Sequence, residues 1–106
     1  MGRLDQNQHD SINELLELIM SLKDMDECRA FFTDLCTMQE LILFAQRVQV
    51  AKRLLAGETY ESIRSKVQVS SSTITRINTA LQFGTGGYQA ALDRLKENSE
   101  KEEPQS

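Results

Sequence analysis

Proline is almost absent from this chain, and that absence constrains the fold more than any other feature. The one proline is Pro104, near the end of the 106-residue sequence, so no proline ring interrupts a helix before it. Three of the five glycines fall within residues 84–87, which leaves the rest of the sequence poor in helix breakers. No long segment alternates between apolar and polar residues with the period of a strand. The sequence therefore predicts an all-α fold.

Capping signals predict where the first two helices begin. The letters S-I-N-E at 11–14 form a potential capping box, in which a hydroxyl and a carboxylate satisfy free backbone amides, and they predict a helix over about 11–22. Asp24 or Asp26 can cap a second, short helix that ends near Leu35. Apolar residues recur at three- and four-residue steps in both segments, so each helix is expected to present one apolar face.

A second capping box, T-M-Q-E at 37–40, predicts a long helix that ends near Ala56, with Gly57 as a left-handed C-cap. The remaining predicted helices cover residues 59–67, 71–82 and 88–97. The expected organisation is therefore a disordered leader over residues 1–9, a single domain of six helices over 10–97, and a disordered charged tail over 98–106.

The segment from Tyr60 to Asn78 has the apolar spacing of a helix-turn-helix, in which two short helices cross steeply and share a small core. With Tyr60 as the first position, the motif needs apolar side chains at positions 4, 8, 10, 15 and 18. All five are β-branched aliphatic residues: Ile63, Val67, Val69, Ile74 and Ile77. The sequence therefore predicts a helix-turn-helix over about 59–82.

Two positions depart from the usual helix-turn-helix pattern. Arg64 stands where a small residue is preferred, because the two helices approach closely there. Gln68 stands where glycine often supplies the turn, and a glutamine in a left-handed conformation costs on the order of 1 kcal/mol. Neither departure outweighs the five apolar matches.

Charge is distributed unevenly along the chain, whose formal net charge is −4. Residues 47–82 carry six basic and two acidic side chains, a net +4, whereas the segments before and after them carry −6 and −2. A basic segment within an acidic chain is expected of a face that contacts DNA phosphates. Because this segment contains the predicted helix-turn-helix, the sequence predicts double-stranded DNA as a partner.

The second helix of the motif begins with small hydroxyl residues, which can closely approach base edges in the major groove. Two cations on the preceding helix can contact phosphates at the edge of the groove. The candidate DNA-binding residues are Arg64, Lys66, Ser70, Ser71, Ser72, Thr73 and Thr75. Ser70 also suits the N-cap of the second helix. The alternative is that these residues only form a well-capped helix start with a solvated face.

Two further stretches are informative together: R-V-Q-V-A-K-R-L-L-A-G-E at 47–58 and S-T-I-T-R at 72–76. With the helix before them they cover about residues 30–82, and over that range the chain resembles the Trp-repressor superfamily, and within it the Trp-repressor-like YerC/YecD group of Gram-positive bacteria. The resemblance implies six helices per chain, an intertwined homodimer with a helix-turn-helix in each half, and repression of transcription through a palindromic operator read in the major groove.

The resemblance also implies a small-molecule site. In the Trp repressor, the tryptophan corepressor lies between the long helix and the recognition helix, held by two arginines near a threonine; the matching residues here are Arg47, Arg76 and Thr37. Guanidinium groups can clamp a carboxylate and face an aromatic ring. However, Ile77 stands where the repressor has glycine, and Ala80 replaces a small hydroxyl residue, so the isoleucine side chain can fill the space of the indole. The alternative for both arginines is a structural or phosphate-contacting role.

Composition disfavours other classes of protein. One histidine, His9, and two cysteines, Cys28 and Cys36, can form neither a four-ligand zinc site nor a catalytic triad, so we expect neither a metal nor an enzyme. No apolar run is long enough to span a bilayer, and the first ten residues lack the apolar core of a signal peptide. The expected protein is cytoplasmic and has no membrane partner.

Broad apolar helix faces favour a homodimer, because a chain this small hides more apolar surface when it shares a core with a second copy. Two alternatives remain to the corepressor-gated repressor. One is a DNA-associated helix-turn-helix protein of another mechanism: a regulator without a small-molecule corepressor, or a protein of the σ-factor or replication-initiator type. The other is an all-helical protein-interaction module, in which the basic segment is only a solvated face.

Overall fold

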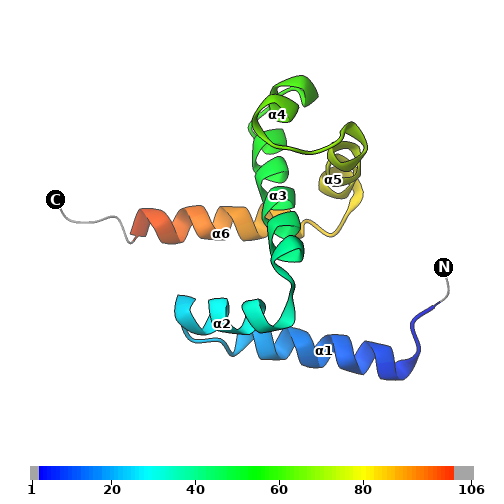
Figure 1. Cartoon of the computed structure of the whole chain (residues 1–106), viewed down its shortest axis with the longest axis vertical. Helices are drawn as coiled ribbons and strands as arrows, with labels where there is room; N and C mark the ends of the chain where they lie inside the picture. The colour runs from blue at the N-terminus through cyan, green and yellow to red at the C-terminus, as the bar shows by residue number, and fades with distance from the viewer. Residues whose placement is uncertain (1–2, 102–106) are drawn as a thin grey trace. The chain divides into compact units, whose positions relative to one another are not determined.

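A computed structural model describes residues 3–101, and every regular element in that range is helical (Figure 1). The helices are α1 (Gln6–Met20), α2 (Met25–Leu35), α3 (Met38–Leu55), α4 (Tyr60–Lys66), α5 (Ser71–Phe83) and α6 (Gly87–Lys101). The predicted all-α class with six helices is confirmed. The chain divides into two compact units, one up to Leu41 and one from Ile42 onward. The single domain expected over 10–97 stays a prediction.

In the first unit, α1 begins earlier than expected. The Asp5 carboxylate accepts a hydrogen bond from the backbone amide of Gln8 at 2.8 Å, and the Gln8 side chain accepts from the amide of Asp5 at 2.8 Å. This capping box replaces the one predicted at 11–14, which lies inside the helix, so the predicted helix start is wrong. The earlier cap adds backbone hydrogen bonds to a helix that is already nucleated, which favours the longer form. Residues 6–9 of the expected leader are therefore helical, and Met1 and Gly2 lie outside the described residues.

Two other caps of the first unit agree with the sequence. Asp24 caps α2 by accepting from the backbone amide of Glu27 at 2.9 Å. Thr37 and Glu40 form the predicted box at the start of α3, with hydrogen bonds of 3.1 Å from the Glu40 amide to the Thr37 hydroxyl and 2.8 Å from the Thr37 amide to the Glu40 carboxylate. These caps are confirmed because each depends only on residues within one turn of the helix start.

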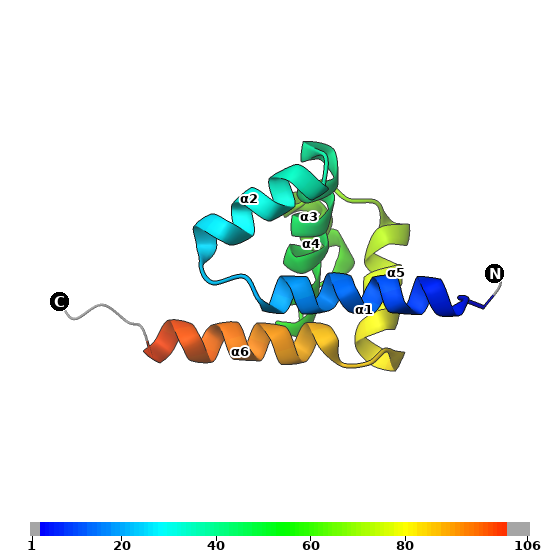
Figure 2. The same cartoon turned by 90° about the horizontal axis from the view of Figure 1, so that it is seen from below.

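The second unit has a core of small aliphatic side chains. Val50 and Ala51 on α3 are fully buried together with Ile63 on α4 and Ile74 on α5, and Ile77 is 3% exposed. Partly buried side chains pack against this core from four helices and the α4–α5 turn: Leu54, Tyr60, Val67, Val69, Leu81, Tyr88 and Leu92. The five β-branched residues of the predicted motif therefore meet in one cluster, as expected from their spacing. Both views show α6 extending away from α5 (Figures 1 and 2).

The junction between α3 and α4 is a Schellman motif, the helix ending that needs a left-handed residue. Gly57 has a φ of +86°, its amide donates to the Leu54 carbonyl at 3.0 Å, and the amide of Glu58 donates to the Arg53 carbonyl at 3.0 Å. The predicted left-handed C-cap at Gly57 is confirmed. This motif turns the chain sharply, and Thr59 then caps α4 by accepting from the amide of Ser62.

The turn between α4 and α5 differs from the expectation for Gln68. Within residues 3–101 only Gly57 and Gly86 have a positive φ, so Gln68 is not left-handed and carries no such strain. Instead the amide of Val69 donates to the Val67 carbonyl at 2.8 Å, which closes a three-residue turn centred on Gln68. The predicted cost of a left-handed glutamine is therefore wrong, because a tight turn of this type needs no residue with positive φ.

The last helix is longer than predicted. α6 follows Gly86, whose φ is +83°, and continues to Lys101, so residues 98–101 of the expected disordered tail are helical. Residues 102–106 lie outside the described part of the chain.

Candidate nucleic-acid interface

The start of α5 is held by its N-cap. The Ser70 hydroxyl accepts from the backbone amide of Thr73 at 3.2 Å and lies 3.0 Å from the Ser72 hydroxyl and 3.1 Å from the Thr73 hydroxyl. The predicted capping role of Ser70 is confirmed. Because its hydroxyl is already committed to the helix start, Ser70 orients the first turn of α5 more than it offers a free group to a ligand.

The first turn of α5 faces solvent, although the helix is anchored on its other side. Ser71, Ser72 and Thr75 are exposed and Thr73 is half-buried, while Ile74 between them is fully buried in the core. The core therefore fixes the helix by its apolar face and leaves a row of small hydroxyl side chains outside. Such a row can approach another molecule closely, because none of its members projects far from the helix.

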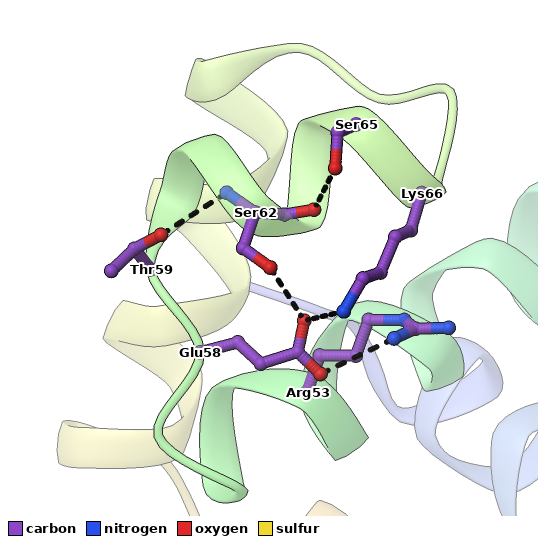
Figure 3. A network of polar contacts seen from close by, with 6 residues as sticks. All are labelled: Arg53, Glu58, Thr59, Ser62, Ser65 and Lys66. Atoms are coloured by element: carbon purple, nitrogen blue, oxygen red, sulfur yellow. Dashed lines mark hydrogen bonds and ion pairs between the residues drawn. The ribbon is translucent and has the colours of Figure 1, made fainter.

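Arg64 and Lys66 are both exposed on α4, but among the described residues only Lys66 has a carboxylate partner. The Lys66 ammonium lies 3.3 Å from the Glu58 carboxylate, which also lies 3.2 Å from the guanidinium of Arg53 (Figure 3). Arg64 has no carboxylate within 4.0 Å in the part of the chain that the structure describes. Of the two predicted phosphate-contacting residues, Arg64 is thus the one without an ion-pair partner in residues 3–101.

Glu58 is the centre of a polar network that the sequence reasoning missed. Besides its two cations, the carboxylate accepts a hydrogen bond from the Ser62 hydroxyl at 3.1 Å (Figure 3). Partial burial alone would raise the pKa of Glu58, but hydrogen bonds from Lys66 and Ser62 and the charges of Lys66 and Arg53 lower it below the usual 4.5. A signal was present: a Schellman motif brings the residue after its glycine next to the residue three before the C-cap, here Glu58 and Arg53.

Arg47 and Arg76, the two arginines of the predicted ligand site, line one cavity of about 240 Å³ in the second unit. The other lining residues are Leu43, Thr73, Ile77, Ala80 and Tyr88. The Arg47 guanidinium also lies 5.7 Å from the centre of the Phe44 ring, within cation–π range. Thr37, the third predicted residue, belongs to the first unit.

The cavity suits a carboxylate better than it suits an indole. Two guanidinium groups can hold a carboxylate, but the volume is below the roughly 300–1,000 Å³ typical of small-molecule sites. Ile77, which narrows the cavity, is 3% exposed and belongs to the core, so it cannot swing aside without disturbing the packing. Tyr88 was not predicted as a lining residue, because only the tertiary packing of α6 brings it to this place.

A family model described as Trp repressor protein matches residues 10–96 of the chain. The chain belongs to the Trp repressor family. The uncharacterized protein YerC of Bacillus subtilis (strain 168) is 41% identical over 95 residues, which cover 90% of this chain and 91% of YerC. The expected resemblance to the Trp-repressor superfamily and to its YerC-like group is therefore confirmed.

Solved structures support the same family. A TrpR-like protein from Eubacterium eligens ATCC 27750 is 40% identical with a TM-score of 0.78, over 82% of this chain and 90% of that protein. A candidate Trp repressor from Staphylococcus aureus is 35% identical with a TM-score of 0.80, over 91% of this chain and 96% of that protein. The chain thus has a Trp-repressor-like all-α fold, and its family is one of regulators by name.

Other kinds of site find no support in residues 3–101. No group of three or more histidine, cysteine or acidic side chains is placed to hold a metal ion there. None of the described helices combines the length and the apolar character that a membrane crossing requires. The first turn of α5, the exposed Arg64 of α4 and the arginine-lined cavity are the candidate sites that this member of the Trp repressor family offers.

Proposed function

We propose that this protein is a sequence-specific DNA-binding transcriptional regulator that acts as a repressor. One observation carries the proposal: the five β-branched residues of α4, the turn and α5 meet in one core that leaves the serine-led first turn of α5 exposed. A pair of short helices with this packing is a helix-turn-helix, and its second helix enters the major groove with its N-terminal residues toward the bases. The recognition helix is then α5.

Each exposed residue of this surface has a defined role in the proposal. Ser71, Ser72 and Thr75 contact base edges or phosphates, while Ser70 and Thr73 hold the first turn in its helical geometry. Arg64 contacts the DNA backbone, because its guanidinium is exposed and has no carboxylate partner among the described residues. Contacts to base edges supply sequence preference, and the contact of Arg64 with the DNA backbone supplies affinity.

The proposed active form is a homodimer that reads a palindromic operator. No residue of α1 or α2 is buried within the single chain, although both helices carry many apolar side chains. The large apolar side chains exposed in this part of the chain are Leu4, Ile12, Leu15, Leu16, Leu18, Met20, Met25, Leu35 and Met38. A second copy hides such a surface and places two recognition helices about 34 Å apart, one turn of DNA. A regulator of this kind works in the cytoplasm.

We further propose that operator binding does not require tryptophan. Ile77 is part of the buried core and also lines the arginine cavity, so space for an indole would have to be made at the expense of core packing. Arg47 already lies against Phe44, which gives it a structural role without any ligand. In this proposal the arginine pair supports the junction between α3 and α5. Addition of amino acids during DNA selection tests whether an anionic effector binds there.

The second candidate function is a protein-interaction module, favoured by the exposed apolar faces of α1 and α2. The two candidates differ in how the chain responds to salt. Binding through phosphates weakens steeply as salt rises, because the release of counterions from DNA into a more concentrated salt solution is less favourable. A module whose basic residues are only solvated shows no binding to genomic DNA fragments even at low salt.

Selection from a random double-stranded DNA library tests the proposed function directly. The expected result is enrichment of a palindromic sequence, with the same consensus and affinity when L-tryptophan or other amino acids are added. If no sequence is enriched at low salt, the protein is not a sequence-specific regulator. If a DNA sequence were enriched only in the presence of one amino acid, that amino acid would be a corepressor, and the arginine-lined cavity would be its candidate site.

A matched pair of variants tests whether α5 is the recognition helix. Ser71→Leu places a bulky side chain on the exposed first turn of α5, and Ser99→Leu makes the same change on an exposed position of α6. The first variant should lose preference for the selected operator while keeping binding to random DNA, and the second should keep both. Unchanged operator preference in Ser71→Leu would show that the recognition helix is misplaced.

A further inference from the structure

Glu58 is held in place by contacts that do not involve Lys66. Its backbone amide is fixed by the Schellman motif through the 3.0 Å hydrogen bond to the Arg53 carbonyl. Its carboxylate is then bound by the Arg53 guanidinium at 3.2 Å and by the Ser62 hydroxyl at 3.1 Å. The side chain is only 23% exposed. A carboxylate held by two neighbouring side chains, on a backbone that is itself fixed, can pair with a further cation without losing much side-chain freedom of its own.

Lys66 is the more exposed partner of this pair. It lies in the last turn of α4, directly before the turn that leads to α5, and its side chain is 49% exposed. Its ammonium lies 3.3 Å from Glu58, across the two turns of α4. A lysine on a flexible four-carbon stem can turn either to this carboxylate or outward to solvent and a phosphate. The network in Figure 3 therefore holds Lys66, a cation of the basic segment, in an internal ion pair.

We propose that Glu58 limits sequence-independent DNA binding by keeping Lys66 away from DNA phosphates; this inference rests on the proposed function. The carboxylate competes with phosphate for the ammonium and also repels phosphate from the end of α4. Each phosphate that a protein neutralises adds roughly 0.9 to the slope of log affinity against log salt concentration. Because this gain is the same on every sequence, a lysine left free would strengthen binding to the many non-specific sites of a genome.

A purely structural role for Glu58 makes a different prediction. If the network only fastened α4 to the end of α3, its loss would loosen the α4–α5 pair and weaken DNA binding. The slope of affinity against salt would then stay the same or decrease, because no new phosphate contact would form. The sign of the change in salt dependence therefore separates the two roles.

The experiment measures binding of the full chain to a random-sequence DNA duplex over a range of salt concentrations. Glu58→Gln keeps the size of the side chain and an acceptor for Ser62 but removes the charge. Glu61→Gln is the matched control, because Glu61 lies on α4 only three residues after Glu58, is exposed and forms no ion pair within the described residues. Both changes alter net charge equally. Lys66→Gln and the double variant Glu58→Gln/Lys66→Gln complete the set.

Glu58→Gln should steepen the salt slope by roughly 0.9 per chain and raise affinity about eightfold at about 0.1 M salt. Glu61→Gln should have a much smaller effect, and the double variant should return to the wild-type slope. If Glu58→Gln and Glu61→Gln had equal effects, the change in net charge alone would explain the result, and the inference would be overturned. A steeper slope that persists in the double variant would overturn it as well, because Lys66 would not be the new contact.

Two further outcomes have a defined meaning. If Glu58→Gln fails to fold, Lys66→Gln decides: an unchanged slope supports the inference, whereas a slope lower by about 0.9 per chain shows that Lys66 already contacts phosphate in the presence of Glu58. If wild type and all variants fail to bind any DNA, the proposed function fails with the inference. If wild type binds and only the effect of Glu58→Gln is missing, the inference alone is wrong.

Discussion

Arg64 and Lys66 lie two residues apart on α4, yet their charges have different surroundings. Lys66 is paired with Glu58, whereas Arg64 is exposed and has no carboxylate within 4.0 Å among residues 3–101. An unpaired guanidinium gives up no internal ion pair when it moves to a phosphate. The two residues therefore belong to different parts of the interface, although their types and spacing in the sequence suggested the same role.

Arg64→Ala should weaken binding to all DNA sequences by a similar factor, because a phosphate contact carries no sequence information. The slope of log affinity against log salt should fall by about 0.9 per chain. Arg94→Ala is the control, since Arg94 is an exposed arginine on α6, which extends away from α5 (Figure 1). Fluorescence anisotropy on operator and random duplexes measures both quantities. A loss confined to the operator would assign Arg64 to base readout.

The lowered pKa of Glu58 makes part of the stability of the protein depend on pH. A carboxylate with a folded-state pKa below 4.5 stabilises the fold at pH values above the unfolded pKa, and this contribution is lost as the pH falls through the folded pKa. The melting temperature of wild type should therefore exceed that of Glu58→Gln at about pH 7, and the difference should shrink toward about pH 3. A difference that stays constant over this range would mean that the ion pairs add nothing to stability.

At the scale of elements, each boundary of the second unit is set by a short local device. The Schellman motif at Gly57 ends α3, the Thr59 hydroxyl starts α4, and the Ser70 hydroxyl starts α5. The three-residue turn centred on Gln68 separates the two short helices without a left-handed residue. These devices fix the angles at which the helices leave one another, and the angles bring the aliphatic side chains into one core.

Gly57→Ala should destabilise the protein by about 1 kcal/mol, because its φ of +86° is a conformation that L-residues avoid. A Cβ atom at this position meets nothing within 4 Å, so the cost comes from the backbone alone. Gly87→Ala is the matched control at the start of α6, where φ is not positive and the added Cβ meets only the Thr85 hydroxyl at 3.6 Å. This variant should be neutral or more stable by up to about 1 kcal/mol.

Urea unfolding at equal protein concentrations compares the two variants, since the stability of an oligomer depends on concentration. The unfolding midpoint of Gly57→Ala should lie below that of wild type, and the midpoint of Gly87→Ala should not. Equal midpoints for wild type and Gly57→Ala would contradict the importance of the left-handed C-cap.

The whole molecule has many exposed apolar side chains, and packing within a single chain does not explain them. α1 and α2 bury no residue, and Leu16 is 52% and Met20 86% exposed. In the second unit, α5 ends in Phe83, which is 81% exposed. Monomeric proteins rarely leave contiguous apolar patches of large area in water. A second copy of the chain is the partner that covers them in the proposed regulator.

Size-exclusion chromatography with light scattering should give a mass near twice the 12.0 kDa of one chain at micromolar concentration. The reason is the burial of apolar area between two copies, worth roughly 25 cal/mol per Å² before the costs of association. Leu16→Lys should shift the mass toward the monomer, whereas Lys96→Gln, an exposed position on α6, should not. A monomer mass for wild type would leave the palindromic operator without a structural basis.

Contacts between residues close in sequence, such as helix caps, were predicted well, with one exception at the start of α1. The caps at Asp24, Thr37 and Ser70 were recognised because each joins residues no more than three positions apart. The first helix was placed too late, because Asp5 and Ser11 both suit an N-cap and their local sequences do not decide between them. The convergence of the five β-branched residues followed from the fixed geometry of two crossing helices.

The six helices, most of their caps and the apolar face of each helix could be predicted from the order of residues, because helical periodicity and capping depend on neighbours within about four residues. The pairing of charges and the set of side chains that share a cavity depend instead on how the helices pack. Lys66 is paired with Glu58, whereas Arg64 has no carboxylate partner among the residues that the structure describes. Arg47, Arg76 and Tyr88 line one cavity because α3, α5 and α6 bring distant parts of the chain together. Coulomb and packing energies depend on distances in space, which the order of residues alone does not state.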